Sequence, residues 1–200
     1  MNTSPHLEVI VGTMFSGKST ELIRRIKRYG VTGLDFQVFK PSIDIRYSLE
    51  QVTSHDGLRL DAYHVGSVRE IRNKTDENAK VIGVEEVQFF DSSIIDLCRD
   101  YVDEGRIVVV NGLNKDFRDE YFPFNDGKAD MSSLLLLADN ITTLYSLCTE
   151  KIAGKLCGEE ASRTQKFIDG QVAPVDSNIV QVGGKESYSP RCRQHFHFYK

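Results

Sequence analysis

The chain has 200 residues, of which 40% are hydrophobic and 27% are charged, with a formal net charge of −4. That length allows one compact core with a small second unit, and the acidic balance argues against a polymeric nucleic acid as the main partner. No apolar run approaches the ~20 residues of a membrane span, and the start Met-Asn-Thr-Ser-Pro-His lacks the features of a secretory signal, so we expect a cytoplasmic protein with no membrane partner.

Strand-like and helix-like segments alternate over the first part of the chain. Strands are expected at residues 7–12, 35–41, 81–86 and 106–113, and helices at 17–29, 68–74 and 92–104. This alternation predicts an α/β fold, with a parallel sheet and helices on both of its faces. Right-handed crossovers then place the carboxyl ends of the strands at one edge, where ligands bind.

The pattern changes near residue 140, where short β-like pieces, turns and three of the four cysteines follow. We therefore expect a boundary within 140–147, between an α/β domain of residues 1–143 and a small β-rich domain of residues 144–200.

A glycine-rich loop joins the first expected strand to the first expected helix. It reads Gly-x-x-x-x-Gly-Lys-Ser from Gly12 to Ser19, which predicts a phosphate-binding loop. Gly12 and Gly17 permit a tight turn of inward-pointing N–H groups, Lys18 can reach the β- and γ-phosphates, and the Ser19 hydroxyl can bind Mg²⁺. The expected ATP site comprises Gly12, Thr13, Met14, Phe15, Ser16, Gly17, Lys18, Ser19 and Thr20.

Two segments that contain arginine follow that loop. Residues 24–28 read Arg-Arg-Ile-Lys-Arg, a spacing that fits the solvent face of the first helix better than a polynucleotide contact. The segment 40–47, which contains Asp44 and Arg46, begins where the second strand ends. An arginine there can stabilise charge on a phosphoryl group during transfer, but pattern alone favours an ordinary exposed loop.

The third expected strand ends in the acidic pair Glu85-Glu86. A buried strand that delivers a carboxylate beside a phosphate loop is what a Mg²⁺ site requires, and the second carboxylate can accept a proton from an attacking hydroxyl. Two solvated glutamates at a strand end are the alternative interpretation.

The cysteines indicate a zinc site in the C-terminal part. Cys148 and Cys157 form C-x₈-C, and Cys192 and His195 form C-x₂-H, which is a usual zinc spacing, whereas the first pair is wider than usual. The wider loop costs about 1.2 kcal/mol of closure entropy, against roughly 10 kcal/mol or more from a structural zinc ion. Cysteines without a metal, and His197 as the fourth ligand, remain alternatives.

In order along the chain, these motifs resemble those of the zinc-containing thymidine kinases of cytosolic and bacterial type, from about residue 7 to residue 197. The similar stretches are Gly-Thr-Met-Phe-Ser-Gly-Lys-Ser-Thr-Glu-Leu at 12–22, Asp-Ile-Arg-Tyr at 44–47, Ser-His-Asp-Gly at 54–57, Glu-Glu-Val-Gln-Phe-Phe at 85–90, Gly-Leu-Asn-Lys-Asp-Phe-Arg at 112–118 and Gly-Gly-Lys-Glu-Ser-Tyr-Ser-Pro-Arg-Cys-Arg at 183–193.

The resemblance implies a RecA-like P-loop sheet with a small zinc-binding domain whose loop covers the substrate. It implies transfer of the γ-phosphoryl of ATP to the 5′-hydroxyl of thymidine, and of deoxyuridine, for DNA precursor salvage. Glu86 would be the general base, Ser19 and Glu85 would bind Mg²⁺, and Lys18 and Arg46 would support the transferring group. Glu85 and Gln88 would also join the ATP site.

The resemblance further implies a set of residues around the nucleoside, a homotetramer, and feedback inhibition by dTTP. The implied substrate-binding residues are Met14, Asp44, Phe89, Leu113, Phe117, Phe122, Thr164, Ile179, Val180, Gln181, Val182, Gly183 and Tyr188.

Three positions depart from the family pattern. Glu85 and Asn114 each replace an aspartate, and Gly154 stands where a C-x₂-C pair would have its first cysteine. Cys148 aligns with that first zinc ligand only if residues 150–156 contain an insertion.

Two other functions compete with the kinase interpretation. A P-loop ATPase switch would hydrolyse ATP in response to a macromolecule and form no nucleoside product. A zinc-stabilised binding module with a vestigial nucleotide site would not bind ATP–Mg²⁺.

Overall fold

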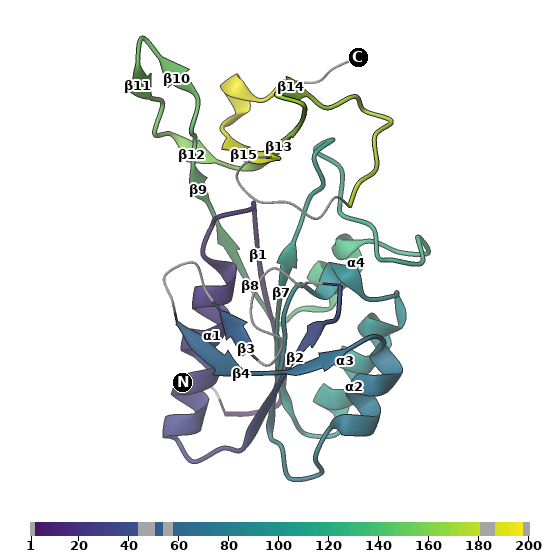
Figure 1. Ribbon diagram of the computed structural model, residues 1–200. Helices are drawn as coiled ribbons and strands as arrows, with labels where there is room; N and C mark the ends of the chain where they lie inside the picture. The colour runs from purple at the N-terminus through teal and green to yellow at the C-terminus, as the bar shows by residue number, and fades with distance from the viewer. Residues whose placement is uncertain (1–2, 44–50, 54–57, 181–186, 198–200) are drawn as a thin grey trace.

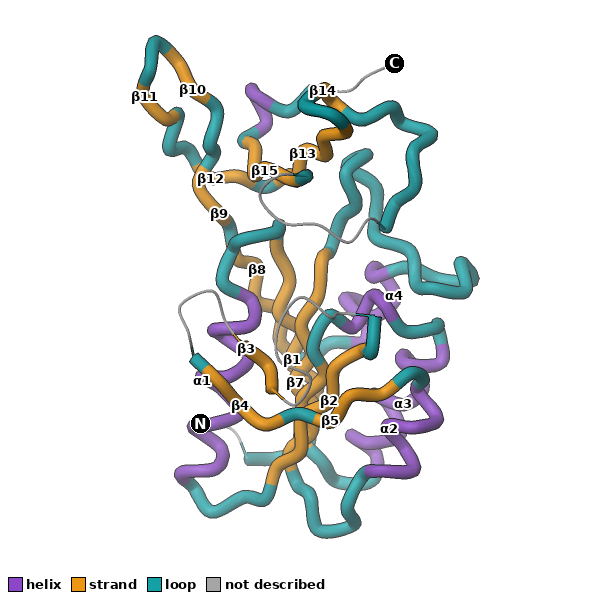
Figure 2. Tube along the Cα trace, viewed as in Figure 1, coloured by secondary structure: helices purple, strands orange, loops and turns teal. Residues whose placement is uncertain are grey.

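A six-stranded parallel sheet forms the centre of the protein. The computed structural model describes residues 3–43, 51–53, 58–180 and 187–197. The strand order is β5-β2-β6-β7-β1-β8, and every neighbouring pair is parallel. The strands are β1 (His6–Gly12), β2 (Phe36–Pro41), β5 (Tyr63–Val65), β6 (Val81–Val84), β7 (Ile107–Leu113) and β8 (Asn140–Leu144). The predicted parallel α/β sheet is confirmed (Figures 1 and 2).

Helices cover both faces of this sheet, as the sequence predicts (Figure 1). Helix α1 (Lys18–Val31) packs on one face, where its Leu22, Ile23 and Ile26 join strand residues in one buried cluster. The other face carries α2 (Val68–Lys74), α3 (Ser93–Asp103) and α4 (Met131–Leu137). Because both faces are buried, the central strands read as continuous apolar runs, which is typical of parallel sheets.

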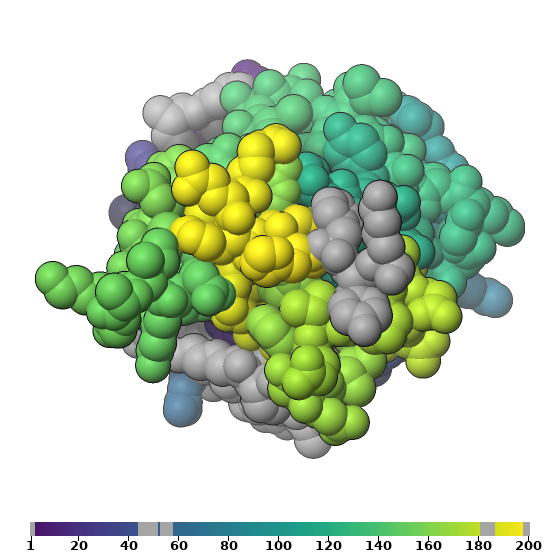
Figure 3. Space-filling model, turned by 90° about the horizontal axis from the view of Figure 1, so that it is seen from above, coloured from purple at the N-terminus to yellow at the C-terminus, as the bar shows by residue number. Residues whose placement is uncertain are grey.

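The C-terminal part consists of short antiparallel strands above the carboxyl edge of the sheet (Figure 1). They are β9 (Ser146–Leu147), β10 (Lys151–Ile152), β11 (Lys155–Leu156), β12 (Glu160–Ala161), β13 (Arg163–Ile168), β14 (Gln171–Val172) and β15 (Tyr188–Arg191), followed by the short 3₁₀ helix η2 (Arg193–His195). The hairpin of β10 and β11 projects from one side of the molecule (Figure 3). A second small hairpin, β3 (Gln51–Thr53) with β4 (Arg59–Asp61), lies beside α1.

A buried polar network fixes α1 against β1. The Glu8 carboxylate accepts hydrogen bonds from the Tyr29 hydroxyl at 2.6 Å and from His6 Nε2 at 2.9 Å, and it pairs with Arg25. Arg25 also donates to Glu21 and, at 2.7 Å, to Thr142 in β8. The prediction that the whole basic run of α1 faces solvent is therefore wrong for Arg25, because this side chain turns inward to the Glu8 carboxylate.

This network predicts a loss of stability in acid. Burial alone raises the pKa of Glu8, but the hydrogen bonds from Tyr29, His6 and Arg25 outweigh it and lower the pKa below its ordinary value of 4.5. The hydrogen bond from Arg24 is the main cause that lowers the pKa of Glu21 to about 2. A lowered carboxyl pKa contributes stability that is complete above pH 4.5 and is lost as the pH falls toward the folded-state value.

We therefore expect the free energy of unfolding, measured by urea titration, to fall as the pH is lowered from 4.5 toward 2. Glu8→Gln is expected to weaken this dependence and lower stability at pH 7, while Glu77→Gln, at an exposed position, leaves both unchanged. An unaltered pH dependence in Glu8→Gln would show that the network does not couple protonation to folding.

Candidate active site

The loop between β1 and α1 has the backbone that a phosphate site needs. Gly17 adopts a left-handed conformation, with φ of 85°, directly before the first residue of α1. A Cβ at Gly12 would lie 2.2 Å from the Leu144 carbonyl oxygen, so only glycine fits beside β8. The Lys18 ammonium donates to the Thr13 carbonyl at 2.9 Å, across the loop. Lys18 therefore lies inside the loop, within which the amide groups and the start of α1 form an anion site.

The acidic pair after β6 meets this loop. The Ser19 hydroxyl, in the first turn of α1, donates a hydrogen bond to the Glu85 carboxylate. Strands β6 and β1 are separated by β7 in the sheet, so the contact exists because the carboxyl ends of all three meet at one edge. A serine hydroxyl and a carboxylate are hard oxygen donors of the kind that Mg²⁺ prefers. The two residues predicted to bind Mg²⁺ thus lie side by side.

Glu86 is held by backbone and side-chain contacts from β7 and from the short 3₁₀ helix η1 (Val87–Phe89). Its backbone is left-handed, with φ of 46° and ψ of 49°, which costs about 1–3 kcal/mol for a residue other than glycine. Asn111 in β7 compensates, since its Oδ1 accepts the Glu86 amide hydrogen at 2.8 Å. Gln88 Nε2 donates to the Glu86 carboxylate at 2.6 Å, and Gln88 Oε1 accepts from Leu113 N at 3.2 Å. The half-buried carboxylate is thereby oriented before any substrate binds.

Asn111 is a site residue that the sequence analysis missed. It is fully buried, and its Nδ2 has no hydrogen-bond partner among the residues that the structure describes. A polar side chain directly after the apolar run 107–110, still within a central strand, was the available signal, because such a group is buried only where it has a polar contact to make.

Aromatic side chains gather beside this edge, in the loop that follows β7. Phe117 and Phe122 are buried, and Phe122 packs edge-on against Phe89 with ring centroids 6.1 Å apart. Leu113, at the end of β7, and Ile179 pack against the same apolar cluster as Phe122. Four residues predicted to bind the nucleoside, Phe89, Leu113, Phe122 and Ile179, thus share one apolar neighbourhood, and Phe117 lies in the same loop as Phe122.

The C-terminal part contacts the phosphate loop directly. The Met14 amide donates to the Thr164 hydroxyl, in β13, at 3.2 Å, and the Thr13 hydroxyl donates to the Ala161 carbonyl at 3.3 Å. Tyr188 is buried in β15, the partner strand of β13. Val180 lies on the segment that leads from β14 toward β15 and is 43% exposed. Five predicted site residues, Asp44, Arg46, Gln181, Val182 and Gly183, lie outside the described residues, as does the Ser-His-Asp-Gly stretch at 54–57.

Three thiols and an imidazole converge in the C-terminal part. Ligand atoms of Cys148, Cys157, Cys192 and His195 all lie within 4.8 Å of one another. His195 Nδ1 is 3.2 Å from the Cys192 sulfur and 3.7 Å from the Cys148 sulfur. Tetrahedral ligands roughly 2.1–2.3 Å from a zinc ion lie roughly 3.5–3.8 Å apart, so this donor set fits zinc. His195 is the histidine of this cluster, and His197 is not part of it.

A hairpin explains the wide spacing of the first cysteine pair. Cys148 follows β9 and Cys157 precedes β12, and these two strands pair with each other. The intervening strands β10 and β11 are joined by Ala153 and Gly154, which have φ of 48° and 82°, as in a type I′ turn. Gly154 is therefore a turn residue, and the hairpin lets the two thiols lie close together.

Comparison with known proteins agrees with these features. The family model described as thymidine kinase matches residues 5–196. A protein named thymidine kinase from Thermococcus kodakarensis is 42% identical to this chain, over 98% of this chain and 95% of that protein. No helix in the described part of the chain is long and apolar enough to cross a membrane. The glycine loop, the carboxylate pair beside it and the matched family model together place this chain in the thymidine kinase family.

Proposed function

We propose that this protein transfers the γ-phosphoryl group of ATP to the 5′-hydroxyl of thymidine, forming dTMP, and that it also accepts deoxyuridine. The observation that carries the proposal is the hydrogen bond between Ser19 and Glu85, which brings the phosphate loop and the carboxylate pair into one site. Family membership supports the choice of nucleoside.

Each part of the site has a role in the proposed reaction. Lys18 and the loop amides bind the triphosphate, and Ser19 with Glu85 would hold Mg²⁺, which supplies positive charge against the phosphate oxygens. The 5′-oxygen forms a bond to the γ-phosphorus while the bond to the β,γ-bridging oxygen breaks, and ADP leaves. The Glu86 carboxylate takes the proton of the 5′-hydroxyl. The guanidinium of Arg46 would support the transferring group.

The role of Gln88 is better described as positioning Glu86 than as binding ATP. Its buried amide already contacts the Glu86 carboxylate and the Leu113 amide, so it acts as a positioning residue. The nucleoside would lie against Phe117 and Phe122, with Met14 and Leu113 beside it and Thr164 and Tyr188 above it. Residues 144–200, as a zinc-binding domain, would cover it through the loop of about residues 172–182, and residues 1–143 would form the kinase domain.

A nucleoside panel tests the proposal. Protein is incubated with ATP and Mg²⁺ alone and with thymidine, deoxyuridine, deoxycytidine or deoxyadenosine, and nucleoside monophosphates are separated from ADP. The proposal predicts dTMP and dUMP in amounts equal to the ADP formed. ADP without a phosphorylated nucleoside would favour the ATPase switch, and failure to bind ATP–Mg²⁺ would favour a binding module.

Three further properties are part of the proposal and rest on the family resemblance. They are a homotetrameric assembly, feedback inhibition by dTTP and a cytoplasmic location. Sedimentation of the purified protein tests the first, and a dTTP titration of the thymidine reaction tests the second.

A further inference from the structure

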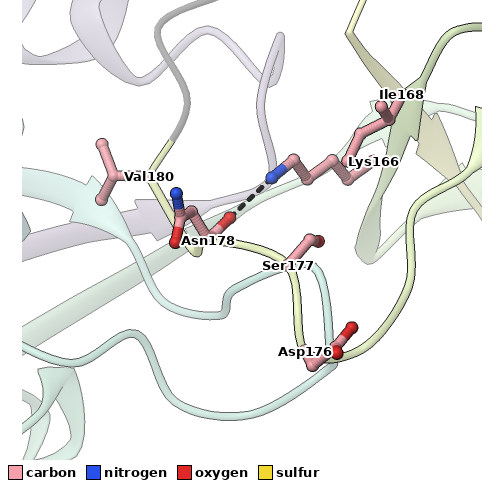
Figure 4. A pocket seen from close by; sticks show the side chains of 6 residues that line it. All are labelled: Lys166, Ile168, Asp176, Ser177, Asn178 and Val180. Carbon is pink, nitrogen blue, oxygen red and sulfur yellow. Dashed lines mark hydrogen bonds between the residues drawn. The ribbon is translucent and has the colours of Figure 1, made fainter.

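Lys166, in β13, is a buried cation that the proposed mechanism does not use. The residue is 1% exposed, and no carboxylate lies within ion-pair distance of it in the part of the chain that the structure describes. Its ammonium instead donates to the Asn178 carbonyl at 2.6 Å (Figure 4). The same Nζ lies 5.1 Å from the centre of the Phe117 ring, within cation–π range. The side chain of Lys166 therefore links its own strand, β13, to the segment after β14 and to the loop after β7.

The segment 173–178 is attached to the protein at both ends through Lys166. The Ala173 amide donates to the Lys166 carbonyl at 3.0 Å, and the Asn178 carbonyl accepts from the Lys166 ammonium. Between these ends, Ser177 bonds back to Pro174 within the segment. These two contacts of Lys166 are the hydrogen bonds that join residues 173–180 to other described residues.

Ala173 is buried at the start of this segment, but side chains do not fill the space beneath residues 176–178. An open pocket of about 410 Å³ lies between it and β13 and is lined by Lys166, Ile168, Asp176, Ser177, Asn178 and Val180 (Figure 4). Beyond the pocket, Ile179 packs against the apolar cluster that includes Phe122. The peptide between Asn178 and Ile179 is thus fixed by the Lys166 ammonium on one side and by apolar contact on the other.

We infer that Lys166 is a positioning residue for the nucleoside, because its ammonium fixes the covering segment at Asn178 and the aromatic wall at Phe117 with a single side chain. This inference rests on the proposed function. In the proposed complex with the nucleoside, Ile179 and Phe117 both contact the nucleoside, so a shift of either residue would weaken nucleoside binding. No hydrogen bond or ion pair joins Lys166 to the phosphate loop among the described residues, so we expect the ATP side of the site to be unaffected.

The test is Lys166→Met, which keeps the length of the side chain and removes its charge and its donors. We expect the KM for thymidine to rise by about tenfold or more, while the KM for ATP stays within about twofold. Lys166→Arg can still donate to the carbonyl and stack on the ring, so its KM for thymidine should stay within about threefold of the unmodified protein. Lys155→Met, on the exposed β10–β11 hairpin, is the matched control and should change neither constant.

The outcomes separate this inference from the proposed function. If the unmodified protein forms no dTMP, the proposed function fails. If it forms dTMP and Lys166→Met leaves the KM for thymidine within about twofold, the role of Lys166 is wrong while the function stands. If Lys166→Met and Lys166→Gln both lose cooperative thermal unfolding, Lys166 acts through stability alone, and the inference is likewise wrong.

Discussion

Replacing Glu86 with glutamine lowers kcat for thymidine phosphorylation by about 10²–10⁴, the contribution of a positioned general base. The new amide can still accept the hydrogen bond from Gln88, so the local structure is retained while the proton acceptor is lost. We expect the KM for ATP and the thermal unfolding midpoint to stay unchanged, because the phosphate loop and the core are not altered. Steady-state kinetics with saturating ATP–Mg²⁺ measures the effect.

Two further variants sharpen this result. Glu86→Asp keeps a carboxylate but draws it back by one methylene, so it should retain more activity than Glu86→Gln. Glu77→Gln removes an exposed carboxylate in the loop before β6, at the opposite end of that strand from Glu86, and should leave kcat unchanged. A decrease in kcat of less than about tenfold in Glu86→Gln would show that another group takes the proton.

Removing a zinc ligand is expected to abolish the function of the C-terminal part. Cys157→Ser should reduce the bound zinc from about one ion per chain to near zero after dialysis against a chelator. We expect loss of the ion to separate the ligands, which lie after β9, before β12 and at the start and end of η2, and so to release β13 with its Thr164 contact to Met14. Thymidine phosphorylation should then fall below detection. Metal content by mass spectrometry and activity after restoring Mg²⁺ measure both effects.

Cys98→Ala is the matched control for that experiment. Cys98 is a buried thiol of α3 and is not part of the zinc-ligand cluster. Burial raises its pKa to about 12, so it is not available as a thiolate. This variant should keep its zinc. Full zinc content and full activity in Cys157→Ser would contradict a zinc site at these four residues.

The Cys148 thiol is suited to metal binding. Burial raises the pKa of Cys148, but hydrogen bonds from the Cys192 and Glu150 backbone and from His195 outweigh it and lower the pKa to about 7. A thiolate is the form that binds zinc, so by lowering this pKa the fold reduces the free energy needed to deprotonate Cys148 when zinc binds.

The sequence was sufficient to predict the central sheet, because its main strands have a strong pattern. The strands β1, β2, β6 and β7 are apolar runs between helical periods, and the phosphate loop and Glu85 lie at their carboxyl ends. Two outer strands were missed: β5 has three residues, and the edge strand β8 is mostly exposed. Short or exposed strands carry little periodicity, so only tertiary pairing identifies them.

Contacts between distant residues could not be predicted in the same way. Arg25 donates to Glu8, 17 positions away, and to Thr142, 117 positions away, and no local pattern reports these contacts. The donation from Lys166 to Asn178 depends on where a loop passes over a strand. The four zinc ligands could be proposed from residue type, but the hairpin that unites Cys148 with Cys157 was visible only in three dimensions.

The departure at Glu85 has a structural counterpart. The side chain is one methylene longer than the family's aspartate, and its carboxylate reaches the Ser19 hydroxyl directly. Asn114, the other departure, uses its backbone carbonyl to accept the Phe122 amide at 3.1 Å, so its structural role does not depend on a charged side chain.

The most direct measurement is a crystal structure of the protein with Mg²⁺, a non-hydrolysable ATP analogue and thymidine. The account predicts the triphosphate within the loop of residues 12–19 and the thymidine 5′-oxygen about 2.6–3.2 Å from a Glu86 carboxylate oxygen. A thymidine whose 5′-oxygen points away from Glu86, or a triphosphate outside that loop, would contradict it.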